Sequence, residues 1–127
     1  MQIGYIVARV FSSKAQIPIS NASLTVISEK DGETKLLGSR VTNRNGKTDP
    51  IPIEAPDKSL STTAGNDSPF TVVDLKIYHP DYSTFYVKNA QVFAGEISVQ
   101  DAEMLPINEY TAAENRIRTY YVSKQDL

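Results

Sequence analysis

The sequence predicts an all-β protein: an antiparallel Greek-key β-sandwich of about seven strands, with a C-terminal tail that adds a further strand. Two observations support this fold class. Apolar and polar residues alternate with a period of two in successive segments, and Asn, Gly, Asp and Pro separate these segments. No long amphipathic helical pattern occurs before residue 106. A chain of 127 residues has room for one core, so we expect one sandwich domain at residues 1–107 and a tail at residues 108–127.

The first half of the chain supplies four strands. The opening strand is expected over residues 3–11, with Ile3, Tyr5, Val7 and Val10 as its apolar positions. A second strand at residues 22–28 leads into an Asp-Gly dipeptide, which predicts a tight hairpin turn to a return strand at residues 35–42.

Asparagine and glycine at residues 43–47 then turn the chain into a strand at residues 48–54. Pro50 and Pro52 cannot donate to a ladder, so this stretch is expected to be either an edge strand or a loosely paired strand. Residues 55–69 are mostly Ser, Thr, Gly, Asp and Pro, which predicts one long loop.

The second half supplies three more strands of the sandwich. Apolar residues recur through residues 70–78, and the sequence His-Pro-Asp-Tyr at residues 79–82 predicts a turn. A return strand is expected at residues 84–92, and a last crossing, with Ile97, Val99 and Met104, at residues 96–105.

The residue types give little support to a catalytic or metal site. The chain has no cysteine, so no thiolate site is available. Its single histidine, His79, is expected at a strand end just before Pro80, where it lacks the partners for a catalytic triad or for a metal site of several histidines. The carboxylates are expected mostly in turns or at outward positions of strands, and only Asp74, in mid-strand between Val73 and Leu75, is a candidate for a further role. We therefore expect a protein that is not an enzyme and that has no cofactor.

Charge and hydropathy argue against nucleic acid as a partner and against insertion into a membrane. A net charge of −2 provides no basic field for nucleic acid, and no run of about 20 apolar residues predicts membrane insertion. The opening residues lack the basic start of a signal peptide, so we expect synthesis in the cytoplasm.

Several segments together resemble a known family. Val10-Phe11, Ile17-Pro18-Ile19, the stretch from Thr42 to Thr48, the turn at residues 79–82, Val92-Phe93-Ala94-Gly95 and Leu105-Pro106 are similar to carboxypeptidase-regulatory-like β-sandwich domains, which are transthyretin-like in shape. More narrowly, they resemble the amino-terminal module of clostridial spore-cortex-lytic enzymes. The resemblance covers roughly residues 4–107. It implies a bacterial protein associated with a spore or a cell surface, and it transfers no active site.

The tail carries a second apolar segment. Its β-branched and aromatic residues predict an extra strand that mediates assembly, and they are Ile117, Thr119, Tyr120, Tyr121 and Val122. An apolar strand of this kind needs a partner, because it otherwise exposes unpaired backbone groups. It either folds back on its own sheet, or adds to the edge of a neighbouring copy by strand exchange, or stays disordered.

Two hypotheses of function follow. The first is a non-catalytic structural subunit that self-associates through its amino-terminal strand and its tail, as a homo-oligomer or filament in a fibre, appendage or coat. The second is an adaptor module that binds peptidoglycan or a cell-wall protein beside separately encoded hydrolases. Its candidate ligand-facing aromatic residues are Tyr78, Tyr82, Phe85 and Tyr86.

Overall fold

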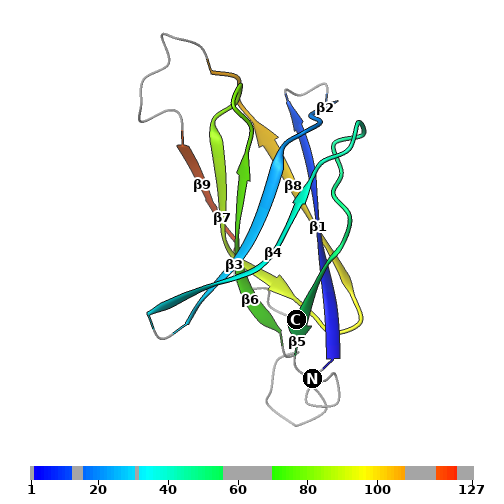
Figure 1. The fold of residues 1–127 in the computed structure, drawn as a ribbon, viewed down its shortest axis with the longest axis vertical. Coiled ribbons are helices and arrows are strands. Elements are labelled where there is room, and N and C mark those ends of the chain that lie inside the picture. Colours follow the sequence, from blue (N-terminus) through cyan, green and yellow to red (C-terminus); the bar gives the residue numbers. More distant parts are fainter. Residues whose placement is uncertain (1, 13–15, 31, 56–69, 108–116, 123–127) are drawn as a thin grey trace.

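The computed structural model describes residues 2–12, 16–30, 32–55, 70–107 and 117–122, and these residues form an all-β sandwich (Figure 1). The described residues contain nine strands and no helix. In chain order the strands are β1 (Gln2–Ser12), β2 (Ile17–Pro18), β3 (Ser23–Lys30), β4 (Glu33–Val41), β5 (Ile51–Ala55), β6 (Thr71–Tyr78), β7 (Thr84–Val92), β8 (Ile97–Met104) and β9 (Ile117–Tyr121).

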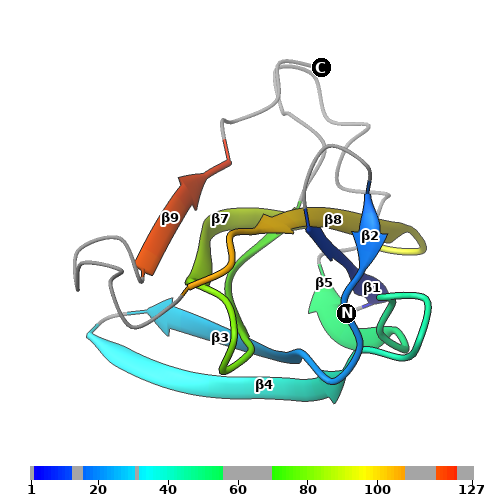
Figure 2. The same ribbon diagram turned by 90° about the horizontal axis from the view of Figure 1, so that it is seen from above.

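The strands form two sheets that enclose the core. In the first sheet β1 is central: β8 pairs with one of its edges, and β5 and β2 pair with the other. The second sheet has the order β4-β3-β6-β7-β9. Seen from above in Figure 2, β8 and β9 lie on the same side of the molecule, where each ends its own sheet.

The predicted strands are confirmed to within a few residues, but the pairing is not purely antiparallel. Both β1 with β8 and β7 with β9 are parallel pairs. Period-two alternation identifies a strand without fixing the direction of its neighbour, so the sequence did not predict this. The two-residue strand β2 is too short to show any alternation.

The core is formed by side chains from both sheets. Its large, fully buried members include Ile6 and Val10 of β1, Leu24 of β3, Leu75 of β6 and Met104 of β8. The opening strand corrects one expectation. Even-numbered residues 4–12 of β1 point inward, so three of the four residues expected as its apolar positions point outward: Ile3, Tyr5 and Val7.

The loop at residues 43–47 is held against β1. Asn43 Oδ1 accepts hydrogen bonds from the N–H groups of Asn45 and Lys47, at 2.9 and 3.2 Å. Gly46 adopts a φ of 75°, and its carbonyl accepts a hydrogen bond from the Val10 N–H at 2.7 Å. A Cβ at Gly46 would lie 2.3 Å from the Val10 carbonyl oxygen, so this close approach requires glycine.

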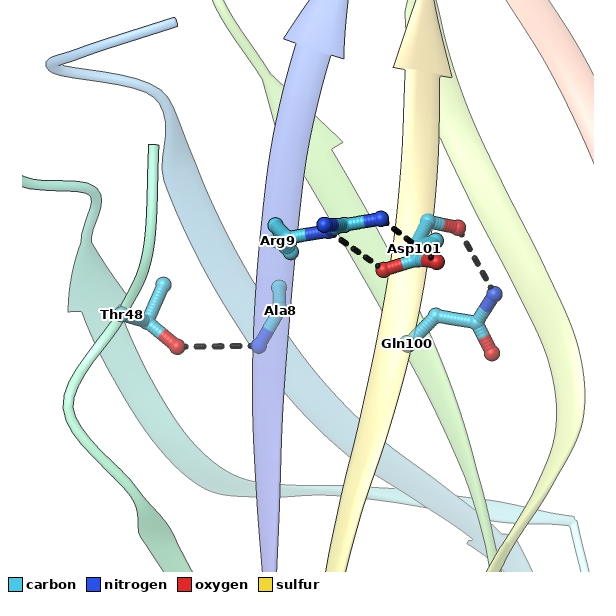
Figure 3. Close-up of polar contacts among 5 residues, drawn as sticks. All are labelled: Ala8, Arg9, Thr48, Gln100 and Asp101. Atoms are coloured by element: carbon cyan, nitrogen blue, oxygen red, sulfur yellow. Dashed lines mark hydrogen bonds and ion pairs between the residues drawn. The ribbon is translucent and has the colours of Figure 1, made fainter. Parts of the chain in front are cut away.

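This loop and β5 together satisfy the backbone of β1 along one edge. The Ala8 N–H donates to Thr48 Oγ1 at 3.0 Å (Figure 3), and the Thr48 N–H donates to the Ala8 carbonyl at 3.1 Å. Of the two arrangements expected from its prolines, β5 has that of an edge strand, because among the described strands it pairs only with β1.

Two predicted segments fall outside the described residues: most of the loop at residues 55–69, and the first half of the tail. Among the residues that the structure describes, no helix has the length and hydropathy needed to cross a bilayer.

Candidate protein-interaction surface

The parallel pairing of β1 with β8 places apolar side chains of both strands on one outward surface. Tyr5 lies opposite Ile97, and Val7 lies opposite Val99. Because successive side chains of a strand point to opposite faces, all four point away from the core. Tyr5 is 38% exposed, and Ile97 and Val99 are each 61% exposed. This part of the sheet is therefore apolar and accessible to a partner.

Two further residues extend this surface. Ile3 lies on β1 two residues before Tyr5 and is exposed, and Pro52 of β5 lies opposite Tyr5 on the other side. A contiguous, exposed apolar patch of this kind is typical of a site that binds another surface. We call it the β1–β8 face, which consists of Ile3, Tyr5, Val7, Pro52, Ile97 and Val99.

An ion pair borders the β1–β8 face. Arg9 Nε and Nη2 donate to the two carboxylate oxygens of Asp101, at 2.9 and 3.1 Å (Figure 3). The Arg9 guanidinium also lies 5.5 Å from the centre of the Phe11 ring. Both charged side chains are partly exposed to solvent, so the pair adds little to stability. Its two charges compensate each other, which leaves this border of the face without a net charge.

One edge of β8 pairs with β1, and the other faces outward. The Tyr5 N–H donates to the Glu96 carbonyl at 2.9 Å. Since alternate residues of a strand bond to the same neighbour in a parallel ladder, odd-numbered residues 97–103 of β8 direct their N–H and C=O groups away from β1. Within the described part of the chain, no strand pairs with β8 on that side. One of these groups is partly satisfied, because Gln100 Nε2 donates to the Asp101 carbonyl at 2.9 Å (Figure 3).

Two adjoining clefts run between β8 and the β7–β9 pair. The first, about 300 Å³ in volume, includes Ser98, Val99 and Val122 among its lining residues. The second, about 380 Å³, is lined by Phe85, by Asp101 of β8 and by Thr119 and Tyr120 of β9. Gln100 lines both, so the clefts are neighbours along the same open side of the sandwich.

The predicted extra strand of the tail is present as β9, and it pairs with β7 of its own chain. The Val122 N–H donates to the Lys88 carbonyl at 2.9 Å, and the Val122 side chain packs against the core. Ile117, Tyr120 and Tyr121 are each more than half exposed, and Thr119 is also exposed. Of the alternatives for the tail, the structure thus contains the strand folded back on its own sheet.

The four aromatic residues of the adaptor hypothesis are not brought together. Tyr78 is 46% exposed at the end of β6, and Tyr86 is half-buried on the same outer face of the second sheet. Tyr82 packs against the core and contacts His79 edge-on, with ring centres 5.2 Å apart. Phe85 is a core residue with 7% exposure, which corrects its expected place on the surface. No platform of outward-facing aromatic rings results.

His79 and Asp74 have structural partners. His79 Nδ1 accepts a hydrogen bond from the Asp81 N–H at 3.1 Å, within the predicted turn. Asp74 accepts a hydrogen bond from the Asn89 N–H at 3.0 Å and forms an ion pair with the Lys88 ammonium at 3.4 Å. These contacts lie at a bulge of β7, where Asn89 has a φ of 65°. No cluster of three metal-ligating side chains occurs among the described residues.

Comparisons with known proteins identify a fold and no family. No family model matches the chain, and no curated protein sequence matches it significantly. The resemblance to carboxypeptidase-regulatory-like domains therefore stays a prediction. Among solved structures, the Bacillus anthracis TIE protein superimposes with a TM-score of 0.52 at 13% identity, over 84% of this chain. The match spans 17% of that protein's chain, and at this identity it shows a shared all-β fold alone.

Two weaker structural matches are also found. A 9R-lipoxygenase from Cyanothece has a TM-score of 0.43 at 17% identity, covering 87% of this chain and 18% of that chain. A chain of a type II cohesin–X-dockerin complex from Acetivibrio cellulolyticus has a TM-score of 0.43 at 23% identity, covering 81% of this chain and 58% of that chain.

Proposed function

We propose that this domain is a non-catalytic assembly module that associates with further copies of itself through the β1–β8 face. One observation carries the proposal: Tyr5 and Ile97, and Val7 and Val99, lie side by side and point outward on neighbouring strands. Burying apolar area of this kind contributes about 25 cal/mol per Å². A second sheet face packed on it would remove these side chains from water.

A second copy of the chain suits this face for two reasons. An isologous interface needs a surface that complements itself, and a largely apolar sheet face packs on an identical face as sandwich sheets do. In addition, Arg9 and Asp101 pair with each other inside one chain, so two copies do not bring unpaired like charges together at this border.

The proposal extends to the setting implied by the resemblance. A self-associating bacterial subunit of this kind would serve in a fibre, an appendage or a coat on a cell or a spore. The amino-terminal strand supplies Ile3, Tyr5 and Val7 to the face, in agreement with the hypothesis that the termini mediate assembly.

The adaptor hypothesis has less support from the geometry. Its residues are divided between the core and the surface, and of the four only Tyr78, at 46%, is an exposed aromatic side chain. In addition, the Lys76 ammonium lies 6.0 Å from the centre of the Tyr78 ring. A purified peptidoglycan fraction that retains the unmodified chain but not a Tyr78→Ala variant would revive this hypothesis.

Substitution of the face tests the proposed function. The variant Tyr5→Ser/Ile97→Ser keeps the backbone and removes two opposed apolar side chains, and we expect it to weaken self-association about tenfold or more. The matched control is Leu36→Ser/Val41→Ser, which removes two similarly exposed side chains from β4 and leaves the face intact. Sedimentation velocity measures both. Equal effects of the two variants would argue against the β1–β8 face.

A further inference from the structure

We propose that two copies meet through the β1–β8 face with their β1 strands antiparallel, and that Glu54 of each copy then forms an ion pair with Lys47 of the other. The inference rests on the proposed function, because it requires that two copies associate through this face. It goes further in assigning the orientation of the two copies and the two side chains that select it.

Glu54 and Lys47 flank opposite ends of the β1–β8 face. Glu54 of β5 lies opposite Ile3, and Lys47 lies opposite Arg9 in an isolated antiparallel bridge. Directly opposed residues of neighbouring strands direct their side chains to the same face of a sheet, so both charged side chains point outward beside the face. Both residues are exposed. The face therefore has an acidic group at one end and a basic group at the other.

Within the described part of the chain, both charges lack a partner of opposite sign. Arg9 pairs with Asp101 and Lys88 pairs with Asp74, whereas no described residue forms an ion pair with Glu54 or Lys47. Backbone groups hold both residues in place: the Lys47 carbonyl accepts a hydrogen bond from the Asn43 N–H at 2.9 Å, and the Glu54 carbonyl accepts one from Thr71 Oγ1 at 2.7 Å. The two side chains are thus positioned by the fold without being used by it.

The two charges are placed symmetrically about the centre of the face. Glu54 and Lys47 lie beside residues 3 and 9 of β1, and each of these is three positions from residue 6. A two-fold axis that crosses β1 at residue 6, perpendicular to the strands and parallel to the face, therefore brings Glu54 of each copy over Lys47 of the other. This axis makes the two β1 strands antiparallel and gives two identical contacts in a closed dimer.

The same axis also matches the apolar side chains. The rows Tyr5–Ile97 and Val7–Val99 lie one residue on either side of it, so Tyr5 of one copy covers Val7 of the other, and Ile97 covers Val99. Sheets packed face to face lie about 10 Å apart, a gap that a glutamate and a lysine side chain bridge when they extend toward each other. The apolar rows then form the centre of the interface, and the ion pairs lie at its border.

The other possible orientation is less favourable in charge. A two-fold axis parallel to the strands would lay the β5 side of each face over the β8 side of the other. Glu54 would then approach the start of β8, where the exposed Glu96 has the same charge. Lys47 would approach Asp101, whose charge Arg9 already compensates. The antiparallel orientation instead gives two contacts between opposite charges, which selects it over the parallel one.

Reversal of the two charges tests the orientation. Glu54→Lys and Lys47→Glu each turn both contacts into repulsions, and we expect each variant to weaken dimerisation about tenfold or more. Glu54→Lys/Lys47→Glu restores opposite charges at both contacts and is expected to associate as the unmodified chain does. The matched controls, Glu29→Lys and Lys76→Glu, change the net charge equally at exposed positions of the second sheet. Sedimentation velocity measures association, and circular dichroism checks that every variant remains folded.

Mixing the two single variants gives a second test. The Glu54→Lys chain has basic groups at both ends of its face, and the Lys47→Glu chain has acidic groups at both ends. An antiparallel heterodimer has opposite charges at both contacts, so the equimolar mixture should associate about tenfold more tightly than either variant alone, and added salt should reduce this difference. A mixture that associates no more tightly than its separate components would contradict the pairing of Glu54 with Lys47.

The outcomes distinguish this proposal from the proposed function. If Tyr5→Ser/Ile97→Ser weakens association while the charge reversals act as their controls do, the antiparallel orientation is overturned and the β1–β8 face stands. If Glu54→Lys strengthens association, the copies are parallel and the orientation is again wrong. An unmodified chain that stays a monomer overturns both proposals.

Discussion

Tyr5 and Ile97 lie directly opposite each other in the parallel pair of β1 and β8, and both side chains point away from the core. The outward position of Tyr5 follows from the alternation of side chains along β1. Even-numbered residues of β1, such as Ile6 and Val10, are buried in the core, so the apolar odd-numbered residues lie on the outer face of the sheet. A strand that is apolar on both faces is typical of a strand covered on both sides.

The buried hydrogen bonds of Thr42 are expected to contribute to stability. Thr42 is buried, accepts a hydrogen bond from the Ala22 N–H at 2.9 Å and donates to the Ile19 carbonyl at 2.7 Å. Thr42→Val removes both hydrogen bonds and leaves the Ala22 N–H and the Ile19 carbonyl without these partners. We therefore expect a loss of about 1–3 kcal/mol in the free energy of unfolding. Urea denaturation measures it. The exposed Thr34→Val on β4 serves as the control, with an expected change within about 0.5 kcal/mol.

Two of the glycines with positive φ, Gly32 and Gly46, are expected to respond differently to alanine. Gly32 and Gly46 have φ values of 79° and 75°, so both substitutions incur the strain of a left-handed residue, about 1 kcal/mol. At Gly32 no atom lies within 4 Å of an added Cβ, whereas at Gly46 the Cβ meets the Val10 carbonyl. Gly46→Ala should therefore be the more destabilising in thermal unfolding. Equal costs would show that the loop moves away from β1 freely.

The bulge in β7 depends on the Asp74 carboxylate. Asp74→Ala removes the acceptor of the Asn89 N–H and the partner of Lys88, and we expect a loss of about 1–2 kcal/mol in the free energy of unfolding. Asp74→Asn keeps a carbonyl oxygen for the Asn89 N–H and should recover part of this loss. If both substitutions cost the same in urea denaturation, the ion pair and not the backbone contact is the important one.

The exposed ion pair beside the β1–β8 face is expected to contribute little to folding. Arg9→Ala should change the free energy of unfolding by less than about 1 kcal/mol, because both partners are partly solvated. The effect should shrink further as salt is added. A large, salt-independent loss in urea denaturation would instead assign Arg9 a packing role against Phe11.

Much of the fold was predictable from local patterns. The predicted strand at residues 84–92 coincides with β7, and the predicted hairpin is present as the antiparallel pair of β3 and β4, with Lys30 opposite Glu33. Alternation and turn residues act over a few neighbours, so a single sequence records them well. The direction of β8 beside β1 depends instead on residues more than ninety positions apart, and no local pattern encodes it.

The candidate surface was harder to predict. Ile97 and Val99 look in sequence like core positions of a strand, yet Ala102 and Met104 of the same strand are the residues that enter the core. The tail was recognised as a strand from its composition, but its partner strand was not, because two sheet edges and a second copy were all compatible with it. The apolar composition of both faces of β1 was the available signal for the β1–β8 face.

Sedimentation equilibrium of the unmodified full chain tests the central claim most directly. An assembly module should show a mass that rises with protein concentration above the 14.0 kDa of one chain. A single species of 14.0 kDa at every concentration, up to hundreds of micromolar, would contradict the account.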